Sequence, residues 1–308
     1  MNGKVLVVGS VNIDLVTRVK RFPRPGETLL GSDYETHHGG KGANQAVAAA
    51  RLGAEVSFLG RVGRDDFGQR LRRGLSEEGI ATGRLIDVEG ASGAAFITLD
   101  ATGQNTIIVA PGANSRLEPD DLPAEAFSQA DVVVLQLEIP TATVMRGIDL
   151  GRQSGVKVIV NAAPAGAMTV DELAGCDLLV VNETEAATLL PGGSAVEPER
   201  LLEALGERFP AVVLTLGSKG LLWRSAGESG RAESGRARAH PVIVVDTTAA
   251  GDAFVGAAAA ALAGGSGLEE AVRLGNAAGA LAVTKAGAQP SLPRLEELQR
   301  LLASDPHA

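Results

Sequence analysis

Short, continuous apolar runs recur along this chain, and helix-like patterns separate them. Val, Leu and Ile dominate the runs, which do not alternate with polar residues as half-buried strands would. The pattern predicts parallel strands that are buried on both faces and covered by helices. Residues 225–239, rich in Gly, Ser and Arg, are expected to form a surface loop between two strands. The expected strands are 5–9, 56–60, 132–137, 156–160, 177–181, 212–216 and 242–245, and expected helices include 43–53, 67–79, 141–155 and 198–209.

Two segments interrupt this alternation. Residues 13–36 and 93–110 carry strand-like stretches that no helix follows, and the second reads as a β-hairpin about a Thr102-Gly103 turn. We expect the two segments to form a small β-rich domain beside the main sheet, although extra edge strands of one sheet are the alternative. The large α/β domain would then comprise residues 1–12, 37–92 and 111–308.

Charge and composition narrow the class of function. The chain has 308 residues, with 28 Lys and Arg against 37 Asp and Glu, which gives a net charge of −9. Such a chain has no general attraction for nucleic acid or anionic membranes, and an aromatic content of 3% is too low for base-stacking platforms. Cys176 is the sole cysteine, and the apolar runs are too short for a signal peptide or a membrane span. We therefore expect a cytoplasmic protein without nucleic-acid or membrane partners.

The strongest local signal is VVDTTAAGDAFVGAAAAALAGG at residues 244–265. A strand is expected to end at Val245, and an Ala-rich helix to begin near Gly251. The small residues between them let backbone N–H groups approach a ligand, and a helix N-terminus favours negative charge. Asp252 in the first helical turn should be ionised at pH 7. The arrangement suits phosphoryl transfer to a hydroxyl whose proton Asp252 accepts, although an Asp that only supports the helix is the alternative.

Other polar residues follow expected strands or begin helices. In HHGGKGANQ (37–45), adjacent glycines lead into a helix, and Lys41 and Asn44 can donate hydrogen bonds to hydroxyls. This segment fits neither the P-loop nor the dinucleotide fingerprint, so a sugar site and a simple helix start remain equal alternatives.

Asn12 and Asp14 lie on one face after the first strand, where they could bind sugar hydroxyls or form a turn. Glu138, after strand 132–137, could bind ligand or face water.

Two further segments could serve a nucleotide. Asn182 and Glu185 follow a strand at a spacing that puts them on one side, where they could hold a hydrated Mg²⁺ or cap a helix. TLGSKG, at residues 215–220, is a Gly-rich turn that could pass close to a nucleotide.

Taken in order, these motifs resemble those of the PfkB family of carbohydrate kinases, also called the ribokinase family, from about residue 4 to residue 294. One departure is Asn161-Ala162-Ala163-Pro164, where the family usually has Asn-Pro-Ala-Pro. The segments that carry the resemblance are GSVNIDLV (9–16), FPRPGETLLG (22–31), GGKGANQAVAAARLGA (39–54), VGRDDFG (62–68), IIVAPGAN (107–114), VNETEA (181–186), TLGSKG (215–220), DTTAAGD (246–252) and GAQPS (287–291).

The resemblance implies a three-layer α/β/α fold with a mostly parallel central sheet and a small β-sheet lid. The lid would close over the sugar and pair with a second copy in a homodimer. The implied reaction is ATP-dependent phosphorylation of D-ribose at O5. Alternatives are a sibling kinase for deoxyribose, fructose, a ketodeoxy sugar acid or a nucleoside and, less favoured, a sugar-binding regulator without catalysis. A sugar acid would want an arginine such as Arg18 or Arg21, and a nucleoside would want aromatic residues that the chain lacks.

The resemblance also implies roles for individual residues. Asp252 corresponds to the catalytic base, and Ala249, Ala250 and Gly251 to the anion hole. Sugar contacts would be Asn12, Asp14, Gly39, Gly40, Lys41, Gly42, Asn44, Glu138 and Asp252. Nucleotide contacts would be Asn182, Thr215, Leu216, Gly217, Ser218, Lys219, Gly220, Gly251 and Asn276. Glu185 would act on Mg²⁺ indirectly, and an activating K⁺ would lie among Asp246, Thr248, Ala282, Lys285, Gly287 and Ser291.

Overall fold

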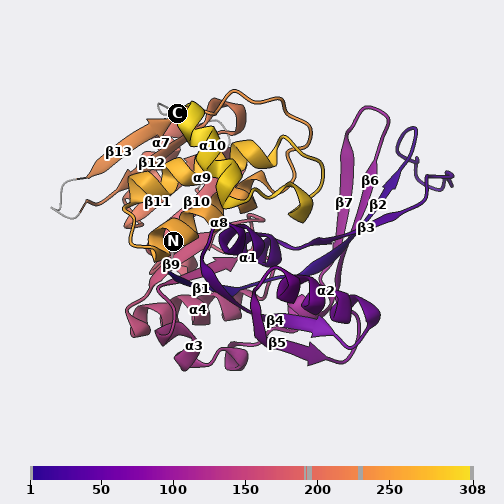
Figure 1. Cartoon of the computed structure of the whole chain (residues 1–308), viewed down its shortest axis with the longest axis horizontal. Coiled ribbons are helices and arrows are strands. Elements are labelled where there is room, and N and C mark those ends of the chain that lie inside the picture. Colours follow the sequence, from indigo (N-terminus) through magenta and orange to yellow (C-terminus); the bar gives the residue numbers. More distant parts are fainter. Residues whose placement is uncertain (1–2, 191, 193–195, 228–231, 306–308) are drawn as a thin grey trace.

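The computed structural model describes residues 3–190, 192, 196–227 and 232–305. Within these residues, nine strands form the main sheet in the order β13-β12-β11-β10-β9-β8-β1-β4-β5 (Figure 1). All neighbours are parallel except β12 and β13, which run antiparallel at one edge. The strands are β1 (Lys4–Val8), β4 (Glu55–Gly63), β5 (Ala81–Val88), β8 (Val132–Gln136), β9 (Lys157–Asn161), β10 (Leu178–Asn182), β11 (Ala211–Thr215), β12 (Leu221–Ser225) and β13 (Glu233–Ala237).

Helices cover both faces of this sheet, which confirms the three-layer fold. Alternate residues of β1 point into different cores, since Val5 and Val7 pack in one apolar cluster and Leu6 and Val8 in the other. One face carries α1 (Lys41–Arg51), α2 (Asp66–Glu77), α8 (Ala250–Ala263), α9 (Leu268–Ala282) and α10 (Leu295–Ser304). The other carries α3 (Ala124–Ser128), α4 (Thr141–Ser154), α5 (Val170–Leu173), α6 (Glu183–Leu189) and α7 (Pro198–Gly206).

Within the described ranges, the remaining helical turns are short 3₁₀ segments at Gly112–Arg116, Pro119–Asp121, Gly217–Lys219 and Gln289–Ser291. Among the helices of the described ranges, none combines the length and apolarity that a membrane crossing would require.

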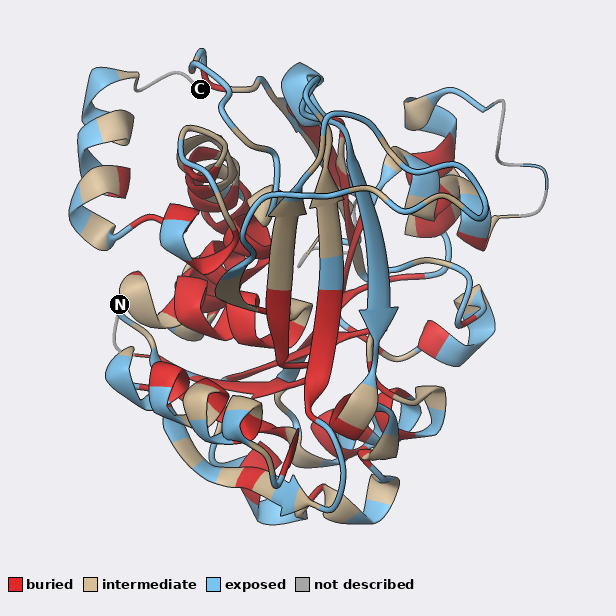
Figure 2. Cartoon of the chain, turned by 90° about the vertical axis from the view of Figure 1, so that its right-hand side faces the viewer, coloured by how far each residue is buried: buried red, intermediate tan, exposed pale blue. Residues whose placement is uncertain are grey.

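A second sheet projects from the main body (Figure 1). In the described chain it has four strands in the order β3 (Glu35–Gly39), β2 (Asn12–Arg18), β6 (Gly93–Leu99) and β7 (Asn105–Ala110). The expected hairpin is confirmed, because β6 and β7 pair antiparallel with Leu99 opposite Asn105. The sheet is larger than expected, since it includes Asn12 and runs on to Gly39 rather than stopping at residue 36. Figure 2 shows β7 exposed along its whole length, whereas its neighbours are buried where they approach the main body.

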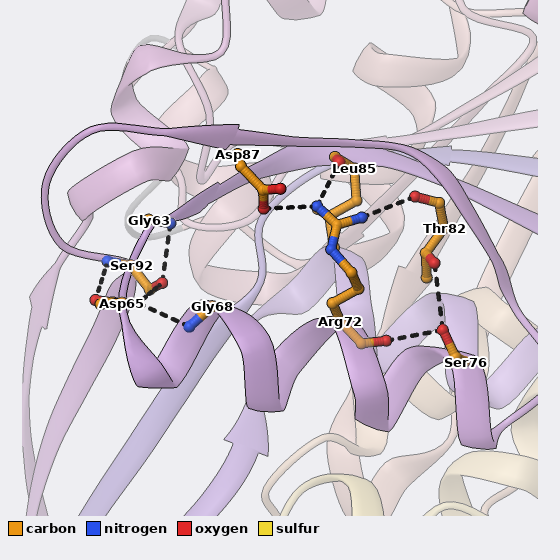
Figure 3. A network of polar contacts seen from close by, with 9 residues as sticks. All are labelled: Gly63, Asp65, Gly68, Arg72, Ser76, Thr82, Leu85, Asp87 and Ser92. Carbon is orange, nitrogen blue, oxygen red and sulfur yellow. Dashed lines mark hydrogen bonds and ion pairs between the residues drawn. The ribbon is translucent and has the colours of Figure 1, made fainter.

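The VGRDDFG segment fastens the small sheet to the main body (Figure 3). Asp65 caps α2 by accepting from Gly68 N at 2.7 Å. The same carboxylate accepts from Ser92 N at 2.9 Å and from Ser92 Oγ at 2.6 Å, directly before β6. Ser92 Oγ in turn accepts from Gly63 N at 2.9 Å. Partial burial alone would raise the pKa of Asp65, but these hydrogen bonds lower it. The start of β6 is therefore held by an ionised side chain.

Two expectations for the main sheet are wrong. Residues 242–245 are not a strand but an extended loop that pairs with no strand, and Ile243, Val244 and Val245 are 85%, 58% and 60% exposed. Val245 N bonds to Val283 O at the end of α9. Conversely, the expected loop 225–239 contains the edge strand β13 at 233–237, while residues 228–231 lie outside the described part. An edge strand pairs through its backbone, so its side chains can be polar.

Candidate active site

The head of α8 presents free backbone donors. Ala249, the N-cap, has φ of 60°, the one positive φ outside glycine in the described residues. This left-handed conformation is strained for alanine, and such strain gathers at functional sites. The backbone N–H groups of Ala249 and Gly251 have no acceptor within the described chain. A Cβ built on Gly251 would meet no atom within 4 Å, so this turn faces open space. The turn is therefore suited to bind an anion.

A cavity of about 200 Å³ opens at this turn. It brings eight of the predicted residues to one place: Lys41, Asn182, Glu185, Thr215, Ala249, Ala250, Gly251 and Asp252. It also includes Thr247 of the small-residue turn, and it has walls that were not expected from the sequence, at Asn161, Ala163, Val180 and Val181. Leu216, Gly217, Ser218, Lys219, Gly220 and Asn276, which the resemblance assigned to nucleotide, do not line it.

Two adjacent residues of α1 bind the carboxylate of Asp252. Asn44 Nδ2 donates to Oδ2 and Gln45 Nε2 donates to Oδ1, each at 2.9 Å. Asp252 is only 6% exposed, and this burial raises its pKa, while Lys41, Asn44 and Gln45 act in the opposite direction. The sequence reasoning considered only the helix terminus and missed this burial. Asn44, which the resemblance assigned to the sugar, therefore also binds the carboxylate of Asp252.

Other acidic groups lie close enough to Asp252 for their charges to interact. Asp14 lies on β2, and burial, followed by the charges of Glu138 and Asp252, raises its pKa to about 7. Lys41 is the cation among them. Burial alone would lower the pKa of Lys41, but Asp252, Glu138 and Glu185 outweigh burial and raise it. We refer to Asp14, Lys41, Glu138 and Asp252 as the acidic cluster.

The glycines of GGKG serve close backbone packing. A Cβ on Gly39 would overlap the carboxylate of Asp14. A Cβ on Gly42 would lie 2.7 Å from Ser10 N, and one on Gly40, with φ of 88°, would lie 2.8 Å from Asn12 N. The loop therefore approaches β2 and the β1–β2 turn because it lacks side chains. Close packing within the protein thus requires these glycines, in addition to the expected approach of their backbone to a ligand.

Glu138 anchors the head of α1. Its Oε2 accepts from Ser10 Oγ at 2.6 Å and from Lys41 N at 3.0 Å. Ser10 Oγ also accepts from Gly42 N at 3.3 Å. One oxygen of Glu138 therefore binds groups of the protein itself. The sequence suggested only two alternatives for this residue, contact with a ligand or with water.

Asn12 is oriented by a residue that the sequence reasoning missed. Asn114 Nδ2 donates to Asn12 Oδ1 at 2.7 Å. Asn114 is itself fixed, because its Oδ1 accepts from Val11 N at 3.0 Å and its Nδ2 donates to Val11 O at 3.2 Å. The available signal was its place at the end of the APGAN segment. Gln45 and Asn161 were also missed, although Gln45 lies within the GGKGANQ segment.

Asn182 and Glu185 form a capping box on α6. Asn182 Oδ1 accepts from Glu185 N, and Glu185 Oε2 accepts from Asn182 N, both at 2.8 Å. Capping, one of the two alternatives from sequence, is therefore confirmed. It does not exclude a ligand role, because both residues also line the cavity. Burial, the first cause, raises the pKa of Glu185, although the N–H of Asn182 and the charge of Lys41 oppose it.

The loops expected to hold K⁺ are joined by Asp246. Its Oδ1 accepts from Thr248 N at 2.9 Å and Thr248 Oγ1 at 2.6 Å, and its Oδ2 accepts from Gly287 N at 2.9 Å. Ser291 Oγ donates to Ala288 O at 2.8 Å. The ammonium of Lys285 pairs with Glu297 at 2.6 Å, so only the backbone of Lys285 could serve a cation. Across the described ranges, no three His, Cys, Asp or Glu side chains are grouped to hold a metal.

Comparisons with known proteins agree with this geometry. The model of the pfkB family of carbohydrate kinases matches residues 2–295. Ribokinase from Haemophilus influenzae is 39% identical over 98% of this chain and 99% of that protein. The solved ribokinase of Thermotoga maritima is 37% identical, with a TM-score of 0.90 over 98% of this chain and 99% of that one. The Arabidopsis thaliana ribokinase complexed with ribose and ATP is 32% identical, with a TM-score of 0.87 over the same shares. This chain therefore belongs to the PfkB family of carbohydrate kinases.

Proposed function

We propose that this chain transfers the γ-phosphoryl group of ATP to O5 of D-ribose, giving D-ribose 5-phosphate and ADP. The observation that carries the proposal is the pairing of a buried carboxylate, Asp252, with free N–H groups at Ala249 and Gly251 in one cavity. The carboxylate accepts the proton of the attacking hydroxyl. The N–H groups bind the charge that develops on the transferred phosphoryl group. The ribose and ATP bound by the Arabidopsis relative support the choice of both substrates.

The acidic cluster favours a neutral sugar. Asp14, Glu138 and Asp252 offer acceptors for sugar hydroxyls, whereas the carboxylate of a ketodeoxy sugar acid would be repelled by them. The arginines considered for a sugar acid are already paired, Arg18 with Glu35 and Arg21 with Glu27. Deoxyribose is neutral as well, and it remains the second candidate because it differs from ribose by one hydroxyl.

Two metal ions fit the residues that remain. Glu185 uses one carboxylate oxygen in the capping box, so its other oxygen can orient the waters of a Mg²⁺ that neutralises phosphate charge. Asp246 ties the turn before α8 to the Gly287 loop, and K⁺ would be held mostly by backbone carbonyls of these two loops. Ala282, Lys285 and Ser291 would complete that site, with K⁺ steadying the anion-binding turn.

The small sheet would act as a lid and as the contact between two copies of this chain. Its strands β6 and β7 expose Phe96, Ile107, Ile108 and Val109, which are 50%, 51%, 66% and 45% accessible. Phe96 and Ile108 are cross-strand partners on one face of the sheet, and Ile107 and Val109 lie on the other. Exposed apolar side chains that gather in this way are typical of an interface. Sedimentation equilibrium should give a dimer for the parent chain and a monomer for Ile108→Lys.

The substrate assignment is tested with a panel of sugars, ATP and Mg²⁺, with and without K⁺. We expect ribose to give the highest kcat/KM, the product to carry phosphate on O5, and K⁺ to raise the rate. A clearly higher kcat/KM for deoxyribose, fructose or a sugar acid would reject the ribose assignment. Absence of phosphorylation with every sugar would reject the proposed function.

A further inference from the structure

We propose that Gln45 is a positioning residue that orients the carboxylate of Asp252 through a relay of side-chain amides. The proposal rests on the proposed function only in taking Asp252 as the proton acceptor. Gln45 is 1% exposed and does not line the cavity, so it would act on the reaction through Asp252 alone.

The relay joins four elements of the fold. Gln45 on α1 donates both hydrogens of Nε2, one to Asp252 Oδ1 on α8 at 2.9 Å and one to Asn161 Oδ1 on β9 at 3.0 Å. Asn161 Nδ2 then donates to the backbone carbonyl of Val180 on β10 at 3.2 Å. Asn161 is the first residue of the Asn-Ala-Ala-Pro segment, to which the proposed reaction gives no other role.

The relay has one direction. A backbone carbonyl can only accept, so Val180 O requires Asn161 to present its NH₂ group there and its oxygen to Gln45. Gln45 must then present its own NH₂ group to Asn161, and the second hydrogen of that group points at Asp252. A reversed Gln45 amide would place its oxygen against two acceptors. The orientation of Gln45 is thus set by β10, and it matches an ionised Asp252.

This one-way donation opposes the effect of burial. A protonated Oδ1 would bring its hydrogen against the NH₂ group of Gln45, so the relay favours the ionised carboxylate that proton transfer requires. Asn44 supplies a second donor to Oδ2, and the carbonyl oxygens of both amides, Asn44 Oδ1 and Gln45 Oε1, have no partner in the described chain. The two amides differ in that the Gln45 NH₂ group also bonds to Asn161, whereas that of Asn44 bonds only to Asp252 there. Four other charged groups act on Asp252: Lys41 of α1, Asp14 of β2, Glu138 after β8 and Glu185 of α6.

Two variants separate the donor from the shape of the side chain. Gln45→Met keeps the length without a donor, and Gln45→Glu keeps the shape but replaces the donor with a carboxylate. In Gln45→Met we expect kcat to fall about tenfold at neutral pH and the acid limb of kcat to move up by about one pH unit, as loss of a hydrogen bond to a charge implies. Gln45→Glu should show the larger shift. The KM for the sugar should change less than about twofold, because Gln45 touches no substrate.

Gln136→Met is the matched control. Gln136 is a fully buried glutamine on β8, and its amide has no partner in the described chain. Its replacement should leave the acid limb where it is in the parent protein. If Gln45→Met lowers kcat and the melting temperature without moving the acid limb, Gln45 is a packing residue and the proposal is wrong.

The pKa of Asp252 can also be read without turnover. In protein with ¹³C-labelled Asp carboxyls, the resonance that disappears in Asp252→Asn belongs to Asp252. We expect its titration midpoint to be about one pH unit higher in Gln45→Met than in the parent and unchanged in Gln136→Met. Equal midpoints in parent and Gln45→Met would overturn the relay. Because this titration needs no substrate, it gives an answer even if the chain phosphorylates no sugar.

Discussion

The two sides of the candidate active site are built differently. On the side that we propose for the sugar (the sugar side), the side chains are buried or half-buried and already bonded to the protein: Asn12 to Asn114, Glu138 to Ser10, and Asp252 to Asn44 and Gln45. On the side that we propose for the phosphate (the phosphate side), the donors are backbone N–H groups without acceptors in the described chain, and the preceding loop exposes Ile243, Val244 and Val245. The fold therefore completes the sugar side itself and leaves the phosphate side for a ligand to complete.

Asp252 joins the two sides, and its removal should have the largest effect. In Asp252→Asn the amide keeps the size of the side chain but cannot accept the hydroxyl proton as a base. We expect kcat to fall by about 10²-fold or more, while ribose and ATP bind nearly as before. Calorimetric titration with each substrate supplies the binding control. Turnover close to that of the parent would remove the assigned role.

The same substitution, glycine to alanine, should lower the stability on the sugar side and leave it unchanged on the phosphate side. A Cβ on Gly42 would lie 2.7 Å from backbone of Ser10, whereas a Cβ on Gly251 would meet nothing within 4 Å. We expect Gly42→Ala to lower the free energy of unfolding by about 2–3 kcal/mol, and Gly251→Ala to leave it unchanged within about 0.5 kcal/mol. Urea denaturation measures both. Equal losses would mean that the phosphate side is as tightly built as the sugar side.

Asp14 should make the sugar side sensitive to pH. Its pKa is raised from 3.8 to about 7, so the protonated form is the one that the fold favours. Its contribution to stability is fully present below about pH 4 and is lost as the pH rises to about 7. We expect Asp14→Asn to reduce the decline in the free energy of unfolding between pH 4 and pH 8, by up to about 4 kcal/mol.

Unfolding of parent and Asp14→Asn across this pH range, without substrate, checks the assignment. Parallel pH curves for the two proteins would show that Asp14 titrates normally. The same variant should bind ribose more weakly above about pH 7, where Asp14 is ionised and its carboxylate can accept hydrogen bonds from sugar hydroxyls.

The smallest effect is expected on the phosphate side, at Ile243. This side chain is 85% exposed and precedes Thr247, which lines the cavity. An exposed apolar side chain near the phosphate site can pack against the base of ATP. We expect Ile243→Ser to raise the KM for ATP about three- to tenfold, with the KM for ribose and the melting temperature unchanged. An unchanged KM for ATP would exclude this loop from the nucleotide site.

The sequence predicted the elements whose signals are local. The apolar runs identified the parallel strands except β5 (Ala81–Val88), which was missed. DTTAAGD located the helix N-terminus at which Asp252 lies, because capping and small residues act over a few positions. Residues 242–245 were misread, since an apolar run typical of a buried strand is here exposed in a loop. β13 was missed for the opposite reason, because an edge strand tolerates Gly, Ser and Arg.

The partners of the site residues could not be predicted, because they are distant in the sequence. Ser10 and Glu138 are separated by 128 positions, and Gln45 and Asp252 by 207. Gln45 looks like any residue on the buried face of a helix, and only the packing of α1 against α8 gives it a carboxylate to bind. The local motif and the resemblance to a family both pointed to Asp252, but neither indicated which neighbours control the charge of this group.

A structure with ribose and a non-hydrolysable ATP analogue tests the central claim most directly. We expect the 5-hydroxyl oxygen within about 3 Å of an Asp252 oxygen, and the terminal phosphate on the N–H groups of Ala249 and Gly251. A sugar whose 5-hydroxyl points away from Asp252, or a terminal phosphate bound away from the head of α8, would contradict the account.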